Sequence, residues 1–525
     1  MESGTSGEAI TISKELRWNS LVKELKRVSL LAAPLITVSI LQYMVQVVAL
    51  IMVGHLGELP LASVAIAISV TNVSGFSLLI GLCGGLDTLC GQAYGAKQYK
   101  KIGTFIYSGI ISLQLICIPI ILIWIFMDKL LILMGQDHQI SIEAHKFAIW
   151  LIPGLIAASI YNPLVRFLQC QSLVLPLLLN FVTVLGITSL SCWISVYKLK
   201  FGIQAVSFSL SLCGWLNVVF LGLYINYSSA CEKTRTRFSK DAFCNIWTFL
   251  RFGFPAALMV CLKWWAFEVV TLLSGRLPNP QLETSVLSIC LNISTLLFTV
   301  PVGLGVSVCI RVANELGAGN AKAARLAAWV VICAVVIETS FASVILFGCR
   351  HIVGYAYSHT KQVVNYVATL IPFLCLSIIT DGLQMVLSVY LGVKVGDDGW
   401  VFGFAGIDKE GCGGWVIGFA GVLRWVVVVG FSGLLGVAKG SGWQRLGAYV
   451  NIGAFYLVGI PVAIVLAFVR HLNAKGLWIG ILIGSILQSI LLIIVAALTN
   501  WEKQATKART RATVGDDEQR ANDIQ

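Results

Sequence analysis

Long apolar segments constrain this sequence more than any other feature. Runs of about 20 or more residues with almost no charge alternate with short segments that hold most of the ionisable side chains. A helix of about 20 apolar residues crosses the roughly 30 Å hydrocarbon core of a bilayer. Of the 525 residues, 57% are hydrophobic and 12% are charged, whereas soluble proteins hold about 25% charged residues. The sequence excludes a water-soluble enzyme and predicts a helical membrane protein.

Twelve apolar segments are the predicted membrane spans. They are Val28–Val53, Leu61–Leu82, Ile102–Phe126, His145–Leu168, Val174–Val196, Gly202–Tyr224, Trp247–Ser274, Ser285–Ile310, Leu326–Phe347, Val364–Leu387, Leu446–Phe468 and Leu477–Leu498. The polar remainder consists of an N-terminal tail (1–27), a basic loop (229–246) and a C-terminal tail (499–525), which we expect to be disordered.

The basic residues predict the orientation of these spans. The net charge is +12, but Lys and Arg lie mostly in loops and tails, where they indicate topology rather than nucleic-acid binding. If the N-terminal tail is cytosolic, the same side receives Lys97, Lys100, Lys101, Lys233, Arg235, Arg237, Lys240, Lys322, Arg325 and the basic C-terminal tail. Both termini are then cytosolic, as an even number of spans requires. We do not expect the polar N-terminus to be a cleaved signal peptide. Most of the fifteen cysteines fall within apolar segments, where we expect them to be packing residues.

The chain contains two copies of one unit. From Ala33 the sequence aligns without gaps with the sequence from Phe254, so that Pro34 meets Pro255 and Gly54 meets Gly275. We therefore predict an N-lobe (28–228) and a C-lobe (247–498) of six helices each. An even number of spans per copy gives both lobes the same orientation, with the pseudo-two-fold axis along the membrane normal. Secondary transporters are commonly built from such repeats, although a duplicated channel or membrane enzyme is an alternative.

Four motifs resemble signatures of the multidrug and toxic compound extrusion (MATE) family, in its plant DETOXIFICATION branch. They are GLDTLCGQAYGAKQY (Gly85–Tyr99), CLKWWAFEVVTLLSGRLPNP (Cys261–Pro280), RVANELGAGNAKAAR (Arg311–Arg325) and GSGWQRLGAYVNIGAFYLVGIPVA (Gly440–Ala463). The resemblance implies a proton-coupled antiporter that exports organic cations, xenobiotics or secondary metabolites across the plasma or vacuolar membrane by alternating access. A channel or facilitator of the same fold, and a coupling-impaired or inactive paralogue, are the alternatives.

The expected partners follow from this interpretation. They are a small organic substrate, protons and the lipid bilayer, for a chain that we expect to be a monomer without nucleic acid, cofactor or metal. The six His residues are scattered and no Walker motif is present, so neither an enzyme nor ATP-driven transport is expected.

Three carboxylates fall in the middle of predicted spans, and all three belong to the C-lobe. An ionisable side chain in the membrane is a candidate functional group by default. The resemblance places an acidic coupling residue at Asp381 and a usually acidic position at Glu268, whereas Glu338 matches no motif. For each of them, a hydrogen bond to a neighbouring helix is the structural alternative. We expect the C-lobe to carry proton coupling.

Lys263 departs from the family pattern. Members of the family usually have Glu immediately before the paired Trp, and here the sequence reads LKWW. Three interpretations remain open: Lys263 pairs with Glu268 or Asp381, the protein is altered in coupling or inactive, or the residue is a sequence error. A salt-bridged Lys263 would hold its partner ionised and oppose protonation.

Further candidates concern the substrate and the gate. Trp264, Trp265 and Phe267 offer aromatic surface to an organic cation, although packing against a helix or facing lipid is an equal alternative for a tryptophan. Gln42 and Asn162 offer hydrogen bonds, although polar residues also join helices in lipid. The candidate hinge or inner-gate residues, which follow even-numbered spans, are Gln92, Gly95, Arg311, Asn314, Glu315 and Gly317. Glycines there permit tight turns or positive φ.

A segment of 47 residues, 389–435, interrupts the resemblance. It contains 12 glycines and fits neither a capped helix nor a polar linker. Counting its apolar second half as a thirteenth span would place the basic C-terminal tail outside. We interpret the segment as an unspliced intron or gene-model error, and the alternative is a genuine insertion on the cytosolic membrane surface.

Overall fold

The computed structural model describes residues 3–54, 56, 58–133, 136–198, 201–357, 360–393, 444–497 and 506. The interrupting segment lies outside these residues beyond Val393, and so does the C-terminal tail apart from residue 506. Within the described residues the chain is helical and contains no strand.

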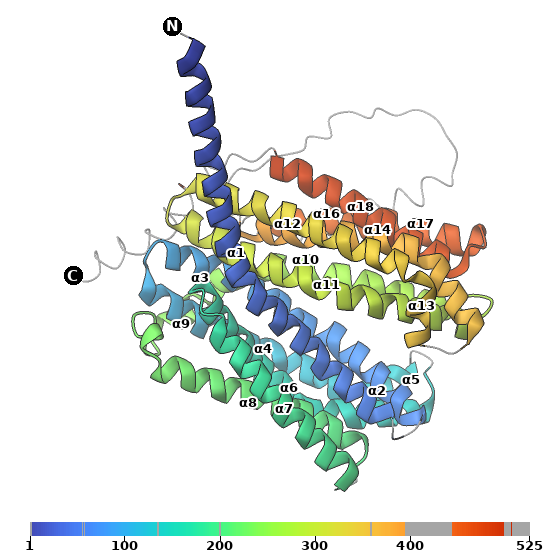
Figure 1. Ribbon diagram of the computed structural model, residues 1–525. Coiled ribbons are helices and arrows are strands. Elements are labelled where there is room, and N and C mark those ends of the chain that lie inside the picture. The colour runs from blue at the N-terminus through green and yellow to red at the C-terminus, as the bar shows by residue number, and fades with distance from the viewer. Residues whose placement is uncertain are drawn as a thin grey trace, which may run out of the picture.

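The first half of the chain forms one bundle. Its helices are α1 (Ser3–Gly54), α2 (Glu58–Thr71), α3 (Ser77–Gly95), α4 (Tyr99–Ile125), α5 (Met127–Leu133), α6 (His138–Cys170), α7 (Leu175–Trp193) and α8 (Ile203–Tyr227), with π-helical segments at Asn72–Phe76 and Ile194–Lys198. Figure 1 shows α1 projecting beyond this bundle at its N-terminal end.

The second half forms a matching bundle beside the first (Figure 1). Its helices are α9 (Asp241–Cys244), α10 (Ile246–Ser274), α11 (Pro280–Gly317), α12 (Ala321–Gly348), α13 (Arg350–Val353), α14 (Lys361–Val393), α16 (Gln444–Asn451), α17 (Ile460–Ile464) and α18 (Asn473–Ala497), with π-helical segments at Ile452–Gly459 and Val465–Val469. There are two large apolar cores. One starts at Val38 in the first half and also includes Phe249 and Ala257 of α10, and the other lies within the second half, from Ala266 to Ile481.

Twelve helical segments of the described chain are long and apolar enough to cross a membrane, which confirms the predicted number and the two six-helix lobes. Two spans continue well beyond their predicted ends. The second continues to Gly95 rather than Leu82, and the eighth to Gly317 rather than Ile310. The last turns of both spans contain glycines and polar residues, but they remain helical because they are buried between the lobes, where α3 and α11 pack together.

Small residues let the lobes approach closely. A Cβ added at Gly85 would come within 2.7 Å of the Gly253 nitrogen, and one at Gly303 within 2.7 Å of the Ile36 nitrogen. Close backbone approach through small residues is the usual way in which helices associate in lipid. Helices α3, α6, α8 and α11 end at the same side of the bundle, next to Lys97, Lys233 and Lys322. We call this end the basic rim and the other end the opposite rim.

Candidate functional site

Lys263 forms an ion pair with Asp381. The Lys263 Nζ lies 3.1 Å from the Asp381 Oδ1, and it also donates to the Gln384 side chain. Ser485 on α18 donates to the same Asp381 oxygen at 3.1 Å, and the ammonium lies 4.9 Å from the centre of the Phe298 ring. The side chains of Lys263 and Asp381 are 13% and 7% exposed. Of the two partners foreseen for Lys263, the structure selects Asp381.

Glu268 lies apart from this pair, on the side of α10 that faces the first lobe. The Ser69 hydroxyl on α2 donates to its Oε2 at 2.9 Å. Among the described residues, no basic side chain lies within ion-pair distance of this half-buried carboxylate. Glu268 is therefore a mid-span carboxylate that bridges the lobes, with no counter-charge in the part of the chain that the structure describes.

Glu338 has a third environment. It is half-buried on α12, and its Oε2 is buried without a hydrogen-bond partner within the described structure. The next residue, Thr339, contacts the position of Gly382, beside Asp381. Among the described residues, Asp381 is thus ion-paired, Glu268 bridges the two lobes, and the Glu338 Oε2 has no partner.

A fourth mid-span carboxylate, Asp87, was missed by the sequence analysis. Asp87 lies well inside the span formed by α3, and its Oδ1 is 3.2 Å from the Arg166 Nη1 of α6. Arg166 also donates to Gln169 at 2.9 Å. The prediction that carboxylates within spans all belong to the C-lobe was wrong, because the predicted second span ended at Leu82 and the helix continues to Gly95. The residues DTLCGQA carry too few apolar side chains to read as membrane-embedded on their own.

The candidate substrate-contacting residues have different environments. Trp264 is 46% exposed, whereas the Trp265 indole donates to the Val73 carbonyl across the lobe interface at 3.3 Å. Phe267 packs against the second-lobe core. Gln42 is exposed on α1 and Asn162 half-buried on α6, and in the described chain no hydrogen bond joins either to the Lys263 pair.

The candidate gate residues meet at the basic rim. Arg311 on α11 forms two hydrogen bonds with Glu24 of α1, at 2.9 and 3.1 Å, and pairs with Glu315 at 2.9 Å. Asn314 donates to the Cys170 carbonyl of α6 at 3.0 Å. A Cβ on Gly95 would overlap the Asn314 carbonyl. These contacts join the two lobes and close the rim between them.

The turn geometry differs from the expectation. Gly95 and Gly317 are the last helical residues of α3 and α11 rather than turn residues. The positive φ angles belong to Lys97 (61°) and Gly319 (82°). Gly95 and Gly317 are instead sites of close packing. A Cβ on Gly317 would overlap the Gln92 carbonyl, and a Cβ on Gly95 would overlap the Asn314 carbonyl. The two motifs thus face each other.

The comparison with protein families agrees with this doubled architecture. The MatE family model matches residues 34–194 and again residues 255–394. The two matches begin 221 residues apart, as Pro34 and Pro255 do in the sequence. The chain belongs to the MatE family. This membership makes it a membrane transporter rather than an enzyme, with an efflux role shared by its relatives.

Its relatives include plant proteins of similar length. The chain is 47% identical to Protein DETOXIFICATION 3 of Arabidopsis thaliana over 94% of both chains, and 45% identical to Protein DETOXIFICATION 1 over 96% of both. The crystal structure of the eukaryotic MATE transporter AtDTX14 superposes with a TM-score of 0.82 at 43% identity, covering 94% of this chain and 100% of that one. These similarities confirm the family and fold that the motifs implied.

Proposed function

We propose that this MatE transporter exports organic cations, xenobiotics or secondary metabolites in exchange for protons, and that Glu268 is the group that carries the proton. One observation supports the assignment most: Glu268 contacts Ser69 of the opposite lobe at 2.9 Å and has no cationic partner in the described structure. Asp381, where the resemblance places an acidic coupling residue, already accepts from the Lys263 ammonium and the Ser485 hydroxyl, at 3.1 Å each.

Protonation of Glu268 would change the contact between the lobes. The ionised carboxylate is a strong acceptor for the Ser69 hydroxyl, and the neutral acid is a weaker one. Loss of the charge in a half-buried, low-dielectric position also removes the cost of keeping an ion there. A proton on Glu268 therefore shifts the balance between the two arrangements of the lobes, which is what coupling requires.

The substrate class follows from the same region. Glu268 supplies negative charge, and the exposed Trp264 supplies an aromatic face to which an organic cation binds. With both termini cytosolic, in the plasma or vacuolar membrane, the closed basic rim corresponds to a conformation sealed toward the cytosol. We expect the protein to transport as a monomer.

The test uses purified protein in liposomes with an imposed pH gradient and ethidium as the cationic probe. Glu268→Gln should abolish gradient-driven uptake. The double variant Lys263→Gln/Asp381→Asn, which replaces the ion pair by neutral groups of similar shape, should retain it. Retained uptake in Glu268→Gln together with loss in the double variant would assign the proton site to Asp381 instead.

The Lys263–Asp381 pair also favours a second candidate, a facilitator of the same fold without coupling. Such a protein would equilibrate ethidium but never concentrate it. Uphill accumulation that collapses on addition of a protonophore would exclude the facilitator, and equilibration that ignores the pH gradient would exclude the antiporter.

A further inference from the structure

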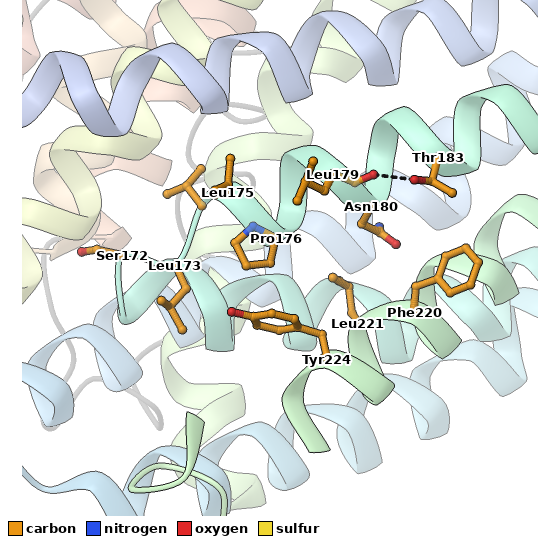
Figure 2. Close-up of a pocket in the computed structure, with 11 residues that line it drawn as sticks. Ser172, Leu173, Leu175, Pro176, Leu179, Asn180, Thr183, Phe220, Leu221 and Tyr224 are labelled. Atoms are coloured by element: carbon orange, nitrogen blue, oxygen red, sulfur yellow. Dashed lines mark hydrogen bonds between the residues drawn. The ribbon is translucent and has the colours of Figure 1, made fainter. Parts of the chain in front are cut away.

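A groove lies on the membrane-facing side of the first lobe, between helices that carry none of Lys263, Glu268, Glu338 and Asp381. It has a volume of about 590 Å³ and runs between α7 and α8 next to the turn after α6. In Figure 2 the ring of Tyr224 lies opposite Pro176 and Leu179, and its hydroxyl points toward Leu173. The lining is mainly apolar, and its volume is within the range of small-molecule sites.

The surroundings of the groove place it in contact with lipid. Leu175 and Leu179 on its edge are 62% and 60% exposed, and both belong to a span, so their side chains face hydrocarbon. From Leu175 to Thr183 the groove follows α7 for about 12 Å at the rise of an α-helix. A Cβ on Gly186, one turn further along, would meet no atom within 4 Å. The groove therefore opens to acyl chains.

The end of the groove at the basic rim is polar and close to positive charge. Ser172 lines it, and the neighbouring Gln171 accepts a hydrogen bond of 2.8 Å from Thr234. Thr234 stands between Lys233 and Arg235, which are both exposed. Tyr227 on the last turn of α8 is 79% exposed, as aromatic residues at the membrane–water interface commonly are. The basic loop therefore lies at the level of the lipid head groups.

We propose that this groove binds an anionic phospholipid, with one acyl chain between α7 and α8 and the phosphate beside Lys233 and Arg235. The apolar lining accounts for the chain, and the basic residues at the interface account for the preference for negative charge. The site is independent of the transport mechanism proposed above.

The experiment measures lipid binding to the full-length protein in detergent by native mass spectrometry, with phosphatidylglycerol and phosphatidylcholine of identical acyl chains. We expect one tightly bound phosphatidylglycerol per protein. Lys233→Ala and Arg235→Ala should each reduce its preference over phosphatidylcholine by about fivefold. Thr183→Trp, which fills the groove, should weaken both lipids by about tenfold, whereas Ile337→Trp, on the exposed face of α12 in the other lobe, should change neither.

Three results would overturn the proposal. Equal binding of the two lipids, unaffected by the Lys233 and Arg235 substitutions, would show that no head group is recognised. Equal effects of Thr183→Trp and Ile337→Trp would place the lipid elsewhere. Displacement of the lipid by ethidium from the same groove would make it a substrate entry site. Size-exclusion profiles matching those of the unmodified protein ensure that the variants are folded.

Discussion

At the scale of single residues, Lys263 departs from the pattern that the family resemblance implies. A lone ammonium in the membrane interior is costly, and the structure places Asp381, Gln384 and the Phe298 ring around it. The pair is neutral as a whole, so the negative charge available at the lobe interface is that of Glu268. Asp381 is thus engaged in the ion pair, and Glu268 is left as the carboxylate that we propose carries the proton.

The ion pair makes a prediction about stability. Lys263→Met leaves the Asp381 carboxylate without its counter-charge, and breaking one side of a buried pair costs about 3–5 kcal/mol. We expect a clearly lower midpoint of thermal unfolding in detergent. Lys263→Met/Asp381→Asn removes both charges and should recover most of the loss. A double variant no more stable than the single one would contradict the pairing.

At the scale of secondary structure, the paired motifs at the ends of α3 and α11 act through backbone contact. Gly95 faces the Asn314 carbonyl, and Gly317 faces the Gln92 carbonyl. The absence of side chains here lets two helix ends from different lobes meet, which no hydrogen-bonding side chain would allow at the same separation.

Gly95→Ala should prevent the rim from closing. The added methyl group overlaps a backbone atom, which cannot rotate away as a side chain does, so we expect transport to be lost. Gly186→Ala on α7 is the matched control because its methyl group meets nothing within 4 Å. Pulsed EPR between spin labels at Lys97 and Lys322, after replacement of the exposed Cys244, Cys333 and Cys349, should report a longer distance in Gly95→Ala only. An unchanged distance would disprove this gate.

At the scale of the whole molecule, α1 belongs to both halves. Its last turns pack into the first-lobe core through Ala49 and Val53, whereas Val28 and Ala32 pack against α11 and α12 of the second lobe. Glu24, one turn before Val28, pairs with Arg311. A helix that ties the two lobes at one rim must change its contacts when that rim opens.

Glu24→Gln should therefore favour the conformation that is open at the basic rim. Loss of a charged pair that exists in one of two conformations shifts their equilibrium by about 1–3 kcal/mol, or roughly 5–150-fold. Accessibility of the Lys97 position to a water-soluble reagent, after substitution by cysteine, measures the shift. Glu143→Gln is the control, because its pair with Lys146 is exposed and worth little. Equal accessibility in both variants would remove Glu24 from the gate.

The number of spans, the two lobes and the family could all be predicted from the sequence alone. A long apolar segment must form a helix to cross the bilayer, and an internal repeat gives two similar sets of such helices. The sequence also indicated the ionisable residues within the later spans, since charge is rare there. It did not find Asp87, because polar and glycine-rich helical turns resemble loops unless a second lobe is known to bury them.

The contacts between ionisable groups could not be predicted in this way, because they join helices far apart in the sequence. Lys263 and Asp381 are 118 residues apart, Glu268 and Ser69 are 199 apart, and Glu24 and Arg311 are 287 apart. No periodic pattern in the sequence indicates which of such widely separated residues come into contact. Whether a carboxylate is paired, bridges the lobes or has no partner among the described residues depends on how helices from the two repeats pack.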